Sequence, residues 1–109
     1  MHMSPQPDMN QLLRQAQKMQ EEMLAAQQEL AARTFEGSAG GGMVKAVVSG
    51  AQELQKVEIS PEVVDPEDVE MLEDLVVAAV RQAMEAAAGA ASEQFGGLSG
   101  GLDLGGLLG

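Results

Sequence analysis

The sequence contains no cysteine, no tryptophan and no tyrosine, and its only histidine is His2. Without cysteine the chain forms no disulfide and uses no thiolate, which fits a reducing compartment. No serine has an ordered histidine to activate it, so a nucleophile, a general base and an orienting group are not assembled. We therefore expect no catalytic residues and no enzyme activity.

Positive charge is also scarce. Six lysines and arginines stand against seventeen aspartates and glutamates, for a formal net charge of −11. Residues 61–109 hold ten of the acidic residues and only one basic residue, Arg81. Since phosphate binding draws on clustered positive charge, this composition alone disfavours nucleic acid as a partner.

Long apolar segments are absent as well. No run of about 18 apolar residues occurs, and no basic segment followed by an apolar one begins the chain. We expect a soluble cytoplasmic protein without a membrane partner. The glycine clusters lack the Lys-Ser/Thr pair of a phosphate loop, so the sequence predicts neither a cofactor nor a small-molecule substrate.

The centre of the chain, residues 43–61, has the pattern of two strands joined by a tight turn. Val44, Ala46 and Val48 alternate with more polar positions, and Val57 and Ile59 alternate with charged ones, which predicts one buried face. In residues 49–52 a glycine, Gly50, is expected to supply the positive φ of the turn, and Pro61 to end the second strand.

A third strand is predicted at residues 33–39. Three glycines, residues 40–42, then reverse the chain into the central pair, which gives a three-stranded antiparallel meander. Because helical segments flank the meander on both sides, the fold class is α+β.

The first helical segment, Asp8 to about Ala32, contains no glycine or proline. Its apolar residues follow a heptad spacing, which predicts packing along another helix or a sheet edge. These residues are Met9, Leu12, Ala16, Met19, Met23, Ala26 and Leu30.

The second helix is predicted to start at Asp65-Pro66 and to end near Ala88. Asp65 suits the N-cap, and Pro66 suits the first helical position. The helix is apolar on most sides, and one small sheet covers only one of them, so we expect a second copy of the chain on the other. The residues assigned to this dimer interface are Val47, Leu54, Leu72, Leu75, Val76, Ala79 and Val80.

The domain organisation follows from these segments. Residues 1–7 are expected to be a flexible N-terminus and residues 8–88 one dimeric domain. Residues 89–109 carry eight of the thirteen glycines and several isolated leucines, and are expected to be a disordered tail.

Two sets of charged residues are candidate binding sites. The acidic residues of segment 67–74 do not converge as a metal site requires, so we expect a solvated face and no metal. If the chain binds nucleic acid, duplex phosphates are the suitable target, because no aromatic residues accompany the basic ones for base stacking. A structural or protein-binding surface is the other interpretation. The candidate basic residues are Arg14, Lys18, Arg33, Lys45 and Lys56.

Taken in order, several segments resemble the YbaB/EbfC family of bacterial nucleoid-associated proteins. They are the helix of residues 10–21, the strand and glycine turn of residues 36–45, the turn at Ser49-Gly50, residues 57–61 and the helix of residues 72–80. No single segment is diagnostic, but the ordered set over roughly residues 9–85 is specific.

The resemblance implies a small α+β homodimer with helices that project like tweezer arms, and a protein that binds duplex DNA and associates with the nucleoid. It also implies a role in nucleoid organisation or gene regulation. The basic residues named above would then contact DNA. The alternative is an acidic dimeric protein-interaction module that does not bind DNA directly.

Overall fold

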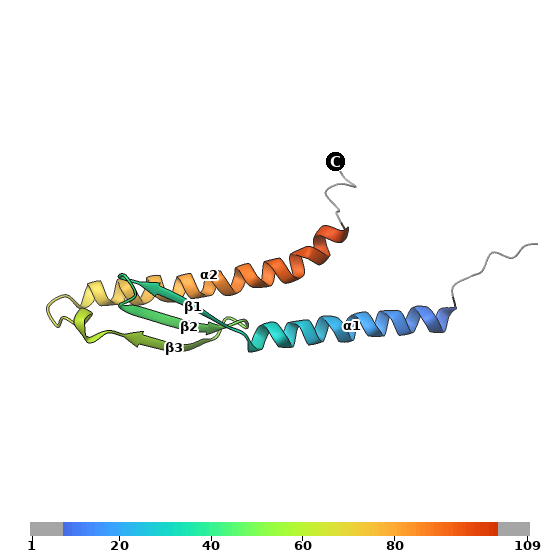
Figure 1. Cartoon of the computed structure of the whole chain (residues 1–109), viewed down its shortest axis with the longest axis horizontal. Helices are drawn as coiled ribbons and strands as arrows, with labels where there is room; N and C mark the ends of the chain where they lie inside the picture. The colour runs from blue at the N-terminus through green and yellow to red at the C-terminus, as the bar shows by residue number, and fades with distance from the viewer. Residues whose placement is uncertain (1–7, 103–109) are drawn as a thin grey trace, which may run out of the picture.

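The computed structural model describes residues 8–102, with side chains to residue 96, as two long helices and a three-stranded sheet (Figure 1). The elements are α1 Met9–Ala32, β1 Thr34–Ala39, β2 Val44–Ser49, β3 Leu54–Ile59, the short 3-10 helix η1 Pro61–Val63 and α2 Val69–Leu102. This arrangement confirms the predicted α+β class. Within the described part, neither helix is long and apolar enough to cross a membrane.

The three strands form the predicted antiparallel meander in the order β1-β2-β3. Gly37 of β1 and Val57 of β3 lie on either side of Ala46 of β2. The β1–β2 turn uses the glycine triplet as expected, since all three of its residues, 40–42, have positive φ angles of 63°, 68° and 91°.

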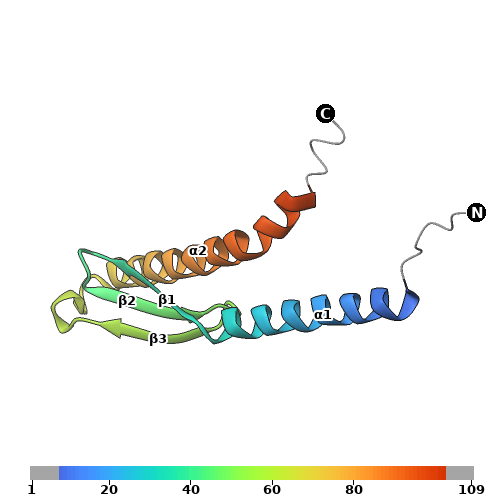
Figure 2. The same ribbon diagram turned by 45° about the vertical axis from the view of Figure 1, so that its right-hand side comes forward.

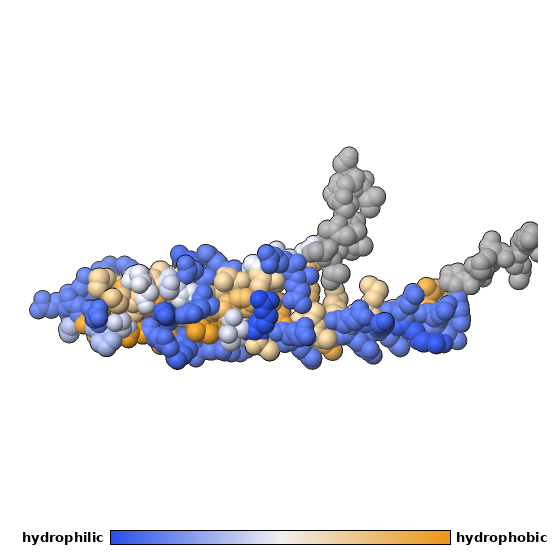
Figure 3. Space-filling view, viewed as in Figure 1, coloured by the Kyte–Doolittle hydropathy of each residue, from blue (hydrophilic) through white to orange (hydrophobic). Residues whose placement is uncertain are grey.

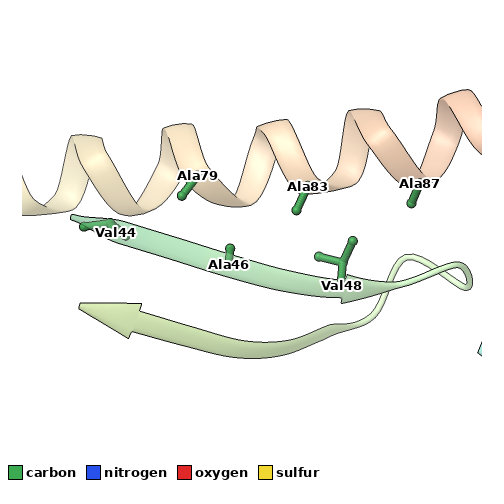
Figure 4. Close-up of a cluster of buried hydrophobic side chains, with 6 residues drawn as sticks. All are labelled: Val44, Ala46, Val48, Ala79, Ala83 and Ala87. Carbon is green, nitrogen blue, oxygen red and sulfur yellow. The ribbon is translucent and has the colours of Figure 1, made fainter. Parts of the chain in front are cut away.

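The core lies between the sheet and α2 and consists of small side chains. Val44, Ala46 and Val48 are spaced by two along β2, and fully buried alanines are spaced by four along α2. Two strand residues span roughly 6.6 Å and four helical residues about 6 Å, so the two rows stay in step over their whole length. Figure 4 shows Ala79, Ala83 and Ala87 facing the strand.

The approach of α2 to β1 is closer still and depends on a glycine. A Cβ atom built on Gly37 would collide with the backbone oxygen of Ala79 and the backbone nitrogen of Ala83. Two glutamines then fix the helix, since Gln82 Oε1 accepts a hydrogen bond from the Ser38 amide at 2.6 Å, and Gln52 Nε2 donates to a carbonyl of α2 at 3.2 Å. The backbone of α2 therefore rests almost directly on β1.

The prediction that Ile59 is buried together with Val57 was wrong. Val57 is half-buried and packs against the core, but Ile59 exposes 40% of its surface. The reason is the position of α2, which covers β1 and β2 and touches β3 little. The inner face of β3 is left partly open within one chain.

The β2–β3 turn forms where predicted, but by a different device. Gln52, not Gly50, has the positive φ, 66°. The turn is organised by the buried Ser49, whose Oγ accepts hydrogen bonds from the amides of Ala51 and Glu53 at 3.2 and 3.3 Å. Gly50 is required for a different reason, because a Cβ there would collide with the carbonyl group of Leu30.

Both predicted ends of the second helix require correction. Asp65 instead caps a turn before the helix, with its Oδ1 accepting from the Glu67 amide at 2.9 Å. Asp68 caps α2 itself, since its Oδ1 accepts from the Met71 amide at 3.2 Å. At the other end the helix continues past Ala88 to Leu102 because glycine weakens a helix without terminating it. Residues 1–7 and 103–109, predicted to be flexible, lie outside the described part.

Helix α1 forms as predicted, with Asp8 as its N-cap, but most of its apolar seam is not covered within the chain. Leu12, Met19 and Met23 expose 44%, 68% and 46% of their surface, and Leu30 is the only buried residue of the helix. Figures 1 and 2 show why, since α1 projects away from the sheet and diverges from α2. The expected contact of the seam with other elements is made only at its C-terminal end. There Leu30 is buried beside Gly50 of the β2–β3 turn, and the Ala26 carbonyl accepts a hydrogen bond from Gln94 Nε2 of α2 at 3.4 Å.

The close approach at Gly37 gives a sharp stability prediction. Gly37→Ala should lower the free energy of unfolding by at least about 2 kcal/mol, because backbone atoms of α2 must move to admit the methyl group. Gly89→Ala is the matched control, since a Cβ there meets no atom of the described chain within 4 Å, and alanine should raise stability by up to about 1 kcal/mol. Urea unfolding followed by circular dichroism measures both variants. Equal stability of Gly37→Ala and the original chain would contradict this packing.

Candidate nucleic-acid interface

Two of the predicted DNA-binding residues, Lys45 and Lys56, lie on the sheet face opposite α2. Both alternate with core positions along their strands and are exposed. In the register Lys45 stands between Ser38 of β1 and Glu58 of β3, and Lys56 stands beside Val47 of β2. The structure thus brings these two lysines together on one face, which is called the open face below.

Each lysine of the open face has an acidic partner. Lys56 Nζ lies 2.6 Å from Glu58 Oε1, and Lys45 Nζ lies 3.9 Å from Glu36 Oε1. These are the two ion pairs among the side chains that the structure describes. With two lysines and two glutamates, the open face has no excess of positive charge.

The Lys56–Glu58 pair keeps both of its charges over the neutral pH range. Its hydrogen bond, and then the attraction of the opposite charge, lower the pKa of Glu58 and raise the pKa of Lys56; Lys45 adds a smaller downward effect on the Glu58 pKa. The lowered pKa of Glu58 contributes to folding stability at neutral pH, and this contribution is lost as the pH falls through the folded pKa of Glu58. The raised pKa of Lys56 also contributes to folding stability, and this contribution is lost only as the pH rises through the folded pKa of Lys56.

The other predicted basic residues lie elsewhere. Arg14 and Lys18 are exposed one turn apart on α1, where hydrophilic residues dominate the face seen in Figure 3. Arg33 follows α1 directly, and its guanidinium carbon lies 4.9 Å from the centre of the Phe35 ring, within reach of a cation–π contact. Since α1 projects away from the sheet, the five residues do not form one cluster within a single chain (Figure 1).

The sequence analysis gave no role to two charged residues that bear on this surface. Glu36 and Glu58 are the partners of the open-face lysines. The alternation of Lys56 with Glu58 already placed that pair on one face, whereas the Glu36 contact depends on the β1–β2 register. Arg81, the sixth basic residue of the chain, is exposed on α2.

The residues assigned to a dimer interface also separate into groups. The assignment of Ala79 to the interface requires correction, because this residue is completely buried against the sheet and offers no surface to a partner. Leu54 is exposed on β3. The remaining ones are half-buried, with Val47 on the open face and the α2 members packed against the core of their own chain: Leu72, Leu75, Val76 and Val80.

The acidic residues that the structure describes do not assemble a metal centre. In the described part of the chain, no three His, Cys, Asp or Glu side chains lie close enough together to hold a metal ion. Helix α2 begins with acidic residues at its positive dipole end, where negative charge is favourable without any ligand.

Comparison with known proteins agrees with the architecture. A crystal structure of an uncharacterized protein from Helicobacter pylori superimposes with a TM-score of 0.70 at 20% identity, covering 85% of this chain and 98% of the other. A likeness at this identity establishes the shared fold and nothing about function.

Sequence relatives are much closer. A nucleoid-associated protein of Saccharopolyspora erythraea is 55% identical over 94% of this chain and 91% of its own length. A nucleoid-associated protein of Pelotomaculum thermopropionicum is 48% identical over 93% of this chain and 96% of its own length. The model of the YbaB/EbfC DNA-binding family matches residues 5–102, a longer range than the residues 9–85 that carry the resemblance. The chain therefore belongs to the YbaB/EbfC DNA-binding family.

Proposed function

We propose that the chain is a homodimeric nucleoid-associated protein that binds duplex DNA mainly through backbone phosphates. The observation that carries the proposal is the family match over residues 5–102, together with relatives of about half-identical sequence that are named nucleoid-associated proteins. The protein would act in the cytoplasm on the nucleoid, in DNA organisation or gene regulation. It would catalyse no reaction and need no cofactor.

Contact with phosphates, not bases, is supported by the side chains available. The chain has two aromatic residues, and one of them, Phe35, is half-buried beside Arg33. A stacking platform for unpaired bases would need exposed aromatic rings. The proposed contacts are made by Arg14, Lys18, Arg33, Lys45 and Lys56. Such binding is sensitive to salt and depends little on sequence.

Dimerisation is supported by the apolar surface that one chain leaves uncovered. Most of the seam of α1 is exposed, and α2 exposes Val69, Val77 and Met84 away from the sheet. The open-face residue Val47 and the exposed Leu54 remain part of the proposed interface, together with the half-buried leucines and valines of α2. A dimer would cover part of this surface and would double the five proposed phosphate contacts.

A second candidate is an acidic dimeric module that binds proteins and not DNA. It is favoured by one observation, the run of exposed acidic residues around η1 and the start of α2. These are Glu62, Asp65, Glu67, Asp68, Glu70, Glu73 and Asp74. Capture of a protein partner that survives nuclease treatment and is lost when Glu67, Glu70 and Asp74 are changed to their amides would support this candidate.

The proposed phosphate contacts of the sheet can be tested by charge reversal. The double variant Lys45→Glu/Lys56→Glu should bind every duplex sequence at least about tenfold more weakly, because contacts to the backbone carry no sequence information. Fluorescence anisotropy with two unrelated duplexes measures the effect. Lys45→Glu alone should weaken binding more than the matched control Arg81→Glu. An unchanged affinity of the double variant would remove these lysines from the interface.

The proposed dimer can be tested on α1 without disturbing the core. Leu12→Gln/Met19→Gln should shift the protein toward monomer in sedimentation equilibrium, because both residues are exposed in one chain and glutamine keeps the helix propensity. Gln11→Ala/Gln20→Ala, on the same helix outside the seam, is the control and should leave the association unchanged. A double seam variant that remains as dimeric as the original chain would exclude α1 from the interface.

A further inference from the structure

We propose that Glu36 and Glu58 act as an intramolecular acidic pair that occupies the open-face lysines and limits the DNA affinity of the sheet. The inference rests on the proposed function, because it concerns the same phosphate contacts. It assigns an effect on DNA affinity to two carboxylates that had no part in the predicted site.

The geometry of the open face supports this role. Glu58 lies two residues after Lys56 on β3, so the side chains share a face, and their charged atoms are 2.6 Å apart. Glu58 is also directly opposite Lys45 in the β2–β3 register. Glu36 approaches the same lysine from β1, at 3.9 Å. Both lysines therefore have carboxylates beside them from neighbouring positions of the sheet.

A phosphate that binds either lysine must compete with these carboxylates. The Lys56–Glu58 hydrogen bond has to break or be shared, and the glutamate then stays near the phosphate as a like charge. The two lysines consequently release fewer counterions from DNA than two isolated lysines would. Their contribution to binding is reduced without any movement of the backbone.

The basic residues of α1 are in a different situation. Glu21 and Glu22 follow Lys18 along the helix, but no ion pair joins Arg14 or Lys18 to a carboxylate among the described side chains. The acidic pair thus distinguishes the two parts of the proposed surface. In the original chain α1 carries most of the salt-dependent binding, and the sheet lysines contribute less than their number indicates.

The test is the double variant Glu36→Gln/Glu58→Gln in the full chain. Glutamine keeps the shape of each side chain and removes only its charge. The matched control is Glu53→Gln/Glu62→Gln, which changes the net charge equally at two exposed glutamates that form no ion pair among the described side chains. Fluorescence anisotropy with a labelled duplex, titrated from low to physiological salt, reports affinity and its salt dependence for all three proteins. Circular dichroism melting verifies that each is folded.

The freed lysines should raise DNA affinity at low salt by at least about tenfold. They should also make the slope of log affinity against log salt concentration steeper by up to about two per chain. The control should change both quantities much less. Equal affinities of the original chain and Glu36→Gln/Glu58→Gln would overturn the inference and leave the proposed function standing. An equal rise in the control would also overturn it, because net charge alone would then explain the effect. If none of the three proteins binds DNA at low salt, the proposed function fails and the inference with it.

Discussion

The fold depends on the close contact between the backbone of α2 and strand β1. Glycine at position 37 and the buried alanines of α2 remove the side-chain volume that normally separates a helix from a sheet. The core is therefore thin, and it includes few large residues. The uncovered apolar surface of α1 has a separate cause, because this helix projects away from the sheet and only its C-terminal end contacts the rest of the chain. The proposed dimer would cover part of this surface.

The elements could be predicted from the sequence because their signals are local. The alternation in residues 44–59, the glycine triplet and the heptad pattern of α1 each depend on neighbours along the chain, and the structure confirms the corresponding elements. The misplaced ends of α2 are local errors of capping and of glycine. Two other errors come from tertiary contacts. Ile59 is exposed because α2 covers β1 and β2, and Gly50 is needed because Leu30 lies above it. Neither contact has a local signature.

The candidate site shows the same division. Alternation along the strands placed Lys45 and Lys56 away from the core, but the charge of their surroundings follows from the strand register, which brings Glu36 and Glu58 beside them. Counting basic residues therefore overestimates the positive charge that the sheet presents. The position of Arg14 and Lys18 on a projecting helix also depends on the tertiary structure, because nothing in a heptad pattern gives the direction in which a helix leaves the domain.

The central claim is that a chain of net charge −11 binds duplex DNA through a small set of basic residues. The most direct measurement is a fluorescence anisotropy titration of a labelled duplex with the full chain, repeated from low to physiological salt. The account predicts binding at low salt and a steep linear fall of log affinity with log salt concentration, whose slope gives the number of phosphates neutralised. Flat anisotropy at low salt, from a protein that sedimentation confirms as dimeric, would contradict it.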